Sequence, residues 1–241
     1  MLMADAQKLL MTMTGEIHQP VRLYYELYDK AKVLQVFKTL RCVQFDLDKQ
    51  GWVWLFQSEA KKLKFATPYG KIPKHRRPII IGAFHFPQDD VMWLDVRSYE
   101  RATKAIVFFD RRLPRSAAQV THAAIVNRLF GVTTATLPPL DTLFDEAKII
   151  EKNPEDILQA AEQFGTIPDV RERIDKVFTF MDQKSREPLP DVEKFPVHFY
   201  EDGITSFETA LKMRQMVALE HWQGNTAFTF GDMIQKIIPG L

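Results

Sequence analysis

The chain has 241 residues, of which 46% are hydrophobic and 26% charged, and this balance is typical of a globular protein rather than a disordered one. Its single cysteine, Cys42, excludes an internal disulfide and indicates a reducing compartment. No apolar run approaches the ~18 residues of a membrane span, and residues 1–16 lack a basic segment followed by an apolar core. We therefore expect a cytoplasmic protein with no membrane insertion.

The first part of the chain predicts a sheet. Strands are expected over residues 21–28, 43–48, 52–57, 78–86 and 91–96, where β-branched and aromatic residues gather or apolar residues alternate with polar ones. A helix is expected between the first two strands, from an N-cap at Asp29 to Arg41. Short turns join the later strands, which favours a mainly antiparallel sheet of about five strands.

Two helices are expected after the fifth strand. Ser98 is the expected N-cap of the first, whose apolar residues recur at helical spacing as far as Leu113. The second is expected over residues 116–130, with Gly131 at its end. The pair can also be interpreted as a helix-turn-helix, although the second helix offers no row of base-reading side chains.

The remainder of the chain predicts mostly helices. Asn153 and Pro154 start one helix, and Asp169 starts a second with an apolar stripe from Val170 to Met181. Three prolines within residues 186–196 indicate a stiff, extended connection. A short strand is expected over residues 197–200, then a helix opened by a capping box at Thr205 and a last helix over residues 228–238.

These elements predict an α+β fold. We expect residues 1–132 to form an α+β domain with flanking helices, and residues 133–241 to form an acidic, mostly helical region packed with that domain as one unit or alongside it.

Charge is unevenly distributed along the chain. The net charge is +1, but residues 61–132 carry 14 basic and 5 acidic residues, whereas residues 133–241 carry 11 basic and 19 acidic ones. This asymmetry favours either an anionic partner at the basic part or mutual neutralisation of the two parts within the fold. The sequence leaves both open.

A basic stretch interleaved with aromatic residues is the strongest functional candidate. No acidic residue occurs from Ala60 to Gln88, and Phe65 and Tyr69 lie among the cations. Together with the basic face expected on the helix after Ser98, the candidate partner-binding residues are Lys61, Lys62, Lys64, Lys71, Lys74, Arg76, Arg77, Arg101, Lys104, Arg111 and Arg112.

Three functions are compatible with these residues. The favoured one is a non-catalytic accessory or adaptor protein whose basic surface binds an acidic protein partner. The alternative is a nucleic-acid-binding protein, because cations contact phosphates and aromatic rings stack on bases. The third is a metal-dependent nuclease built on Asp46, Asp48, Glu59 and Lys61.

Other chemistry finds little support in the sequence. The six histidines have no metal-ligand spacing, and no glycine-rich phosphate loop or Gly-x-Ser-x-Gly motif occurs. We therefore predict no catalytic residue, no metal and no cofactor, and the sequence does not predict an oligomeric state.

Overall fold

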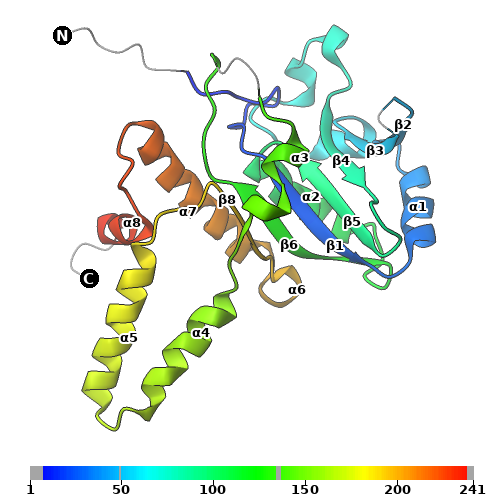
Figure 1. Cartoon of the computed structure of the whole chain (residues 1–241). Coiled ribbons are helices and arrows are strands. Elements are labelled where there is room, and N and C mark those ends of the chain that lie inside the picture. The colour runs from blue at the N-terminus through cyan, green and yellow to red at the C-terminus, as the bar shows by residue number, and fades with distance from the viewer. Residues whose placement is uncertain (1–7, 49, 134–136, 238–241) are drawn as a thin grey trace, which may run out of the picture.

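The chain is organised around one eight-stranded sheet (Figure 1). The computed structural model describes residues 8–48, 50–133 and 137–237. The strand order is β2-β3-β4-β5-β1-β6-β8-β7, and every neighbouring pair is antiparallel except β7 and β8. The strands are β1 (Val21–Leu27), β2 (Val43–Asp46), β3 (Gly51–Leu55), β4 (Ile80–His85), β5 (Val91–Val96), β6 (Ala118–Val126), β7 (Ile150–Glu151) and β8 (Val192–Pro196). The predicted α+β class is confirmed, with a larger and mixed sheet.

Helices follow the sheet strands and dominate the second half of the chain. They are α1 (Lys30–Thr39), α2 (Tyr99–Asp110), α3 (Leu140–Leu143), α4 (Pro154–Glu162), α5 (Val170–Ser185), α6 (Phe199–Asp202), α7 (Ile204–Trp222) and α8 (Phe230–Ile237). No helix in the described part of the chain is both long and apolar enough to span a membrane.

The predicted helix starts are confirmed at four N-caps. The side chains of Asp29, Ser98, Asn153 and Asp169 each accept a backbone N–H of the first helical turn that follows. Helix α7 begins one residue after Gly203 rather than at a cap on Thr205. The expected end of the last helix, Ile238, lies outside the described residues.

The largest correction concerns residues 118–126, which form strand β6 instead of part of a helix. This strand pairs with β1 from Leu27↔Ala118 to Val21↔Ile125, so β1 has β5 on one side and β6 on the other. Pairing across about 100 residues overrides the local preference of the alanines for a helix. The helix-turn-helix interpretation is therefore wrong.

A second correction concerns residues 192–200. Val192–Pro196, expected as part of an extended connection, forms strand β8 between β6 and β7. Residues 197–200, expected as a strand, lead instead into α6, which begins at Phe199. Val192 and Phe195 are buried in β8, which explains why this proline-containing segment joins the sheet. One sheet therefore contains strands from both sides of residue 132.

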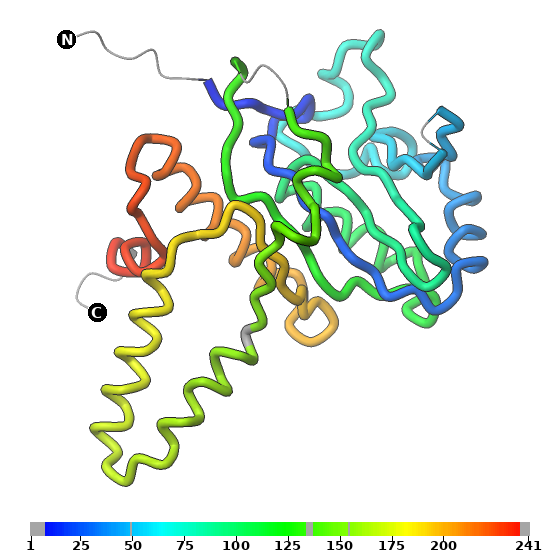
Figure 2. The backbone as a smooth tube through the Cα atoms, viewed as in Figure 1, coloured from blue at the N-terminus to red at the C-terminus, as the bar shows by residue number. Residues whose placement is uncertain are grey.

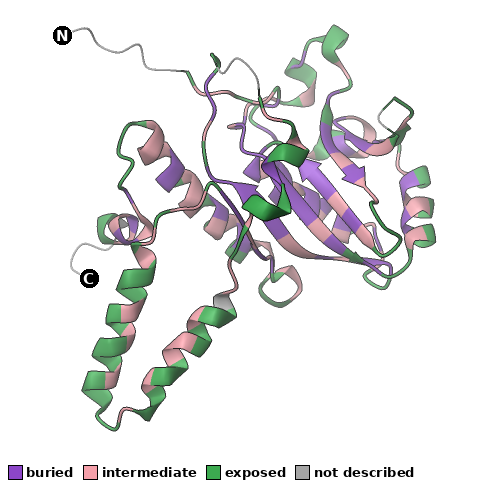
Figure 3. Ribbon diagram, viewed as in Figure 1, coloured by how far each residue is buried: buried purple, intermediate pink, exposed green. Residues whose placement is uncertain are grey.

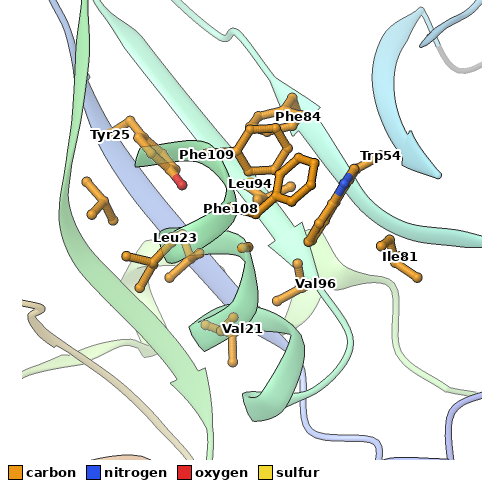
Figure 4. Close-up of a cluster of buried hydrophobic side chains, with 14 of the residues drawn as sticks. Val21, Leu23, Tyr25, Trp54, Ile81, Phe84, Leu94, Val96, Phe108 and Phe109 are labelled. Atoms are coloured by element: carbon orange, nitrogen blue, oxygen red, sulfur yellow. The ribbon is translucent and has the colours of Figure 1, made fainter. Parts of the chain in front are cut away.

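The main core lies between one face of the sheet and helices α1 and α2. Figure 4 shows Trp54, Phe84, Phe108 and Phe109 gathered at its centre. The ring of Phe109 lies 5.1 Å from Trp54 and 4.8 Å from Phe84 in edge-to-face contacts. Large aromatic rings in this geometry contribute strongly to core stability. Helix α2 also contacts α7 and is therefore covered on more than one side.

Helices α4 and α5 form a hairpin that extends away from the sheet, as the backbone trace shows (Figure 2). The connection between them includes a short 3₁₀ helix, η5 (Gln163–Thr166), and the ring of Phe164 meets that of Phe180 at 5.9 Å. No residue of α5 is buried (Figure 3). This hairpin, residues 154–185, is called the arm below.

Candidate functional site

The basic stretch forms a folded connection between β3 and β4. It contains three 3₁₀ helices, η1 (Ser58–Lys62), η2 (Tyr69–Lys71) and η3 (Lys74–Arg76). Phe65 and Ile72 are buried beneath it, and the Phe65 ring meets that of Phe56 at 5.1 Å. The backbone N–H of Thr67 also donates to the carbonyl of Thr14 at 2.7 Å. The connection is therefore a fixed scaffold for the charges that it carries.

Two of its cations contact the ring of Tyr69. The Lys61 ammonium and the Arg77 guanidinium each lie 4.6 Å from the ring centroid. Arg77 also donates from Nη2 to the carbonyl of Gly70 at 2.8 Å and from Nε to that of Ile72 at 2.7 Å. Arg77 thus holds the connection together, and Tyr69 is occupied by cation–π contacts.

The remaining cations of the connection have no anionic partner in the described part of the chain. Lys62, Lys64, Lys71, Lys74 and Arg76 are all exposed, and none of them forms an ion pair with another described residue. Their charged groups therefore face solvent in the described structure. They are available to a partner.

Three further cations lie in α2 or directly after it, and one of them, Lys104, contacts the connection. Lys104 lies 5.5 Å from the ring of Phe65 and pairs with Glu100 at 2.7 Å. Arg111 is exposed, while the guanidinium of Arg112 lies 3.6 Å from the ring of Phe108. We define the basic surface as Lys61, Lys62, Lys64, Lys71, Lys74, Arg76, Arg77, Lys104, Arg111 and Arg112.

Cys42 and Glu59 connect the two parts of the basic surface. Glu59, in η1, accepts the backbone N–H of Cys42 at 3.0 Å, and Arg112 is close enough to Cys42 to act on its thiol electrostatically. Burial, together with a hydrogen bond to Glu59, raises the pKa of Cys42 to about 12. Cys42 is therefore a protonated thiol at neutral pH, with little nucleophilic character.

Arg101 differs from the other predicted binding residues, because it is only 2% exposed. Its Nη2 donates to the hydroxyl of Thr14 at 2.6 Å, and its Nε lies 3.8 Å from a carboxylate oxygen of Glu16. Burial lowers the pKa of Arg101 to about 10. The turn containing Thr14 and Glu16 covers this part of the helix, so Arg101 does not lie on the basic surface.

No acidic residue in the described part of residues 133–241 forms an ion pair with the basic surface. Most basic residues of this acidic part pair within residues 133–241, as Lys194 does with Glu151 at 3.1 Å. In the part of the chain that the structure describes, Arg128–Asp191 at 3.2 Å is the one ion pair between residues 61–132 and residues 133–241. Neither residue belongs to the basic surface.

Two acidic residues of the nuclease hypothesis, Glu59 and Asp46, accept hydrogen bonds from nearby backbone groups. The two carboxylate oxygens of Glu59 accept the backbone N–H groups of Arg41 at 3.4 Å and Cys42 at 3.0 Å, and Asp46 accepts that of Asp48 at 3.0 Å. Among the described residues, no three His, Cys, Asp or Glu side chains converge into a group that could hold a metal ion. Glu59 therefore acts as a cap for the turn at residues 41–42.

A charged cluster on the sheet face opposite α2 is not predicted from the sequence. Arg22 donates from Nε and Nη2 to the two carboxylate oxygens of Asp95 at 2.7 and 2.8 Å, and Nη2 also donates to Asp141 at 2.9 Å. The guanidinium lies 4.4 Å from the ring of Trp93. His85 Nε2 is 3.5 Å from Asp95 Oδ2, the oxygen that also accepts from Arg22 Nη2.

This cluster is built by strand register. Arg22 in β1 lies directly opposite Asp95 in β5, and both occupy polar positions between apolar residues of their strands. A charged residue between apolar neighbours in a strand indicates a buried charge. The sequence does not show its partner, because the partner depends on pairing between distant strands. The side chains of His85 and Asp141 are 43% and 85% exposed, so the cluster reaches solvent through both of them.

A pocket of about 540 Å³ lies at the base of the arm, where β8, α7 and α8 meet. Arg214 lines it and pairs with the buried Glu193 at 2.7 Å, with the guanidinium 4.3 Å from the ring of Phe195. The size suits a small molecule. The charge of Arg214 is already paired with the carboxylate of Glu193.

No protein-family model matches the chain, and neither a curated protein nor a solved structure matches it.

Proposed function

We propose that this chain is a non-catalytic accessory protein that binds an acidic surface of another protein through its basic surface. The observation that carries the proposal is the set of five exposed cations, Lys62, Lys64, Lys71, Lys74 and Arg76, that have no anionic partner among the described residues. They project from a connection that Phe65, Ile72 and Arg77 hold in place, so the charge pattern is preorganised. Preorganised charge favours selective and rapid association with a complementary surface.

The surroundings of the aromatic rings favour a protein partner over a single-stranded nucleic acid. Base stacking requires exposed ring faces. Phe65 is only 6% exposed, and the Tyr69 ring is occupied by Lys61 and Arg77. The basic surface therefore offers charge without a stacking platform, although a nucleic-acid backbone would also be attracted to that charge.

The test is a pull-down from native extract, with and without nuclease treatment, using a charge-reversal variant. Lys71→Glu/Lys74→Glu reverses two free cations of the basic surface. Lys32→Glu/Lys38→Glu makes the same change in net charge at exposed positions of α1 and serves as the matched control. We expect the wild type and the control to retain the same protein partner after nuclease treatment, and the Lys71→Glu/Lys74→Glu variant to lose it.

The experiment also separates the alternatives. Loss of every partner after nuclease treatment, or recovery of nucleic acid with the wild type, would overturn the proposal in favour of a nucleic-acid-binding protein. Equal loss of the partner in both variants would show that net charge, rather than the basic surface, governs capture.

A further inference from the structure

Helix α5 has an apolar stripe with no partner among the described residues. Val170, Ile174, Phe178 and Met181 are exposed by 55%, 47%, 64% and 46%. Their spacing of four, four and three residues places them on one side of the helix. No residue of this 16-residue helix is buried, and Figure 3 shows exposed and intermediate residues alternating along it.

Such a stripe is unusual for a helix that water surrounds. Helical stability in proteins comes mostly from packing of the apolar side rather than from local propensity. Contiguous exposed apolar groups on a soluble chain generally mark an interaction surface. The arm also extends beyond the sheet, so α5 can meet another chain without contact between the sheets (Figure 1).

We propose that α5 pairs antiparallel with α5 of a second copy of this chain, around a twofold axis that crosses the apolar stripe midway between Ile174 and Phe178. In this arrangement Ile174 of each copy faces Phe178 of the other, and Val170 of each copy faces Met181 of the other. A twofold interface requires a self-complementary surface. The apolar stripe meets that requirement because its large side chains lie at nearly equal distances on either side of the axis.

The charges beside the stripe favour the same partner. With about 100° of rotation per residue, Arg171 and Asp182 lie about 60° and about 80° from Ile174, on the same flank of the stripe. A twofold axis brings the same flank of both helices together. Arg171 of each copy would then lie beside Asp182 of the other, giving two complementary pairs.

The existing contacts of these two residues leave them accessible. Asp182 accepts from Arg186 at 2.9 Å on the helix surface, and both Arg171 and Asp182 are exposed. Helix α5 carries four basic and three acidic residues, so two copies can approach without strong net repulsion.

Sedimentation velocity of the full chain between about 1 and 100 µM tests the proposal. We expect a reversible dimer, at least about tenfold weaker in Phe178→Glu, because a buried aromatic at the centre of an interface is commonly a hot spot. Arg171→Asp should also weaken the dimer, because it places carboxylates beside Asp182 of the other copy. Arg171→Asp/Asp182→Arg exchanges the charges and should restore the affinity to within about threefold of the wild type.

Two controls isolate the interface. Lys176→Asp makes the same charge change as Arg171→Asp on the opposite side of the helix, and Lys71→Glu/Lys74→Glu alters only the basic surface; neither should change the dimer. Circular dichroism checks that the variants remain folded. A wild type that stays monomeric at about 100 µM would overturn the proposal and leave a different protein as the occupant of the stripe. A dimer unaffected by Phe178→Glu, or not restored by the charge exchange, would also overturn it.

Discussion

Arg22 in the sheet and Arg76 on the basic surface carry the same guanidinium group, but the fold gives them different surroundings. Arg22 contacts two carboxylates and two aromatic rings, and its side chain is 6% exposed. Arg76 is exposed and has no anionic partner among the described residues. Arg101 resembles Arg22 although the sequence places it with the surface cations. The number of cations in a segment therefore does not tell how many of them a partner can reach.

The strongest way to test this contrast is to truncate the sheet arginine. Arg22→Ala leaves Asp95 buried without its counter-charge, and we expect the free energy of unfolding to fall by about 3–5 kcal/mol. Urea denaturation at pH 7 measures this change. Replacing both partners, as in Arg22→Leu/Asp95→Leu, should cost less than the single change because no unpaired buried charge remains. A double variant less stable than Arg22→Ala would contradict this explanation.

A smaller effect on the free energy of unfolding is expected from His18 as the pH falls. Burial, together with the nearby Arg97 and Arg101, lowers the pKa of His18 to about 4. The unfolded chain binds this proton near pH 6.5, and the folded chain only near pH 4. The free energy of unfolding should therefore fall as the pH drops from about 6.5 to about 4, with a contribution from His18 of about 2 kcal/mol.

Comparison with His18→Gln isolates that contribution, because carboxyl groups also titrate in this range. Urea denaturation at several pH values should give a shallower slope for the variant than for the wild type between pH 4 and pH 6.5. Parallel curves would show that His18 takes up its proton equally well in the folded chain.

The smallest effect on stability is expected at the basic surface. Lys71→Glu/Lys74→Glu should change the free energy of unfolding by no more than about 0.5 kcal/mol, because both side chains are exposed and unpaired in the described structure. The same urea experiment measures it. A loss comparable with that of Arg22→Ala would show that these lysines have a structural role, and would weaken their assignment to partner binding.

Local signals in the sequence predicted a large part of the fold. The N-caps Asp29, Ser98, Asn153 and Asp169 hydrogen-bond to backbone groups two or three residues away, so their role can be recognised without knowledge of the fold. Strands β1 to β5 were also recognised, because their composition agrees with their final environment. The expected antiparallel arrangement of these strands is confirmed.

Strands β6 and β8 were missed because their conformation depends on distant partners. The alanines of residues 118–126 suit a helix, and the prolines before and at the end of β8 suit an extended connection. Pairing of β6 with β1, and then of β8 with β6, decides both segments. Such pairing is a property of the whole sheet and has no signature within either segment.

The helix caps, the first five strands and the clustering of cations around residues 61–77 can be predicted from the sequence, because each depends on neighbours along the chain. Three features follow from the fold instead: Arg101 is buried against Glu16, Arg22 and Asp95 meet across two strands, and the apolar stripe of α5 remains exposed. Burial and ion pairing depend on which surfaces the fold brings together. Amphipathic spacing identifies an apolar side but not whether anything covers it.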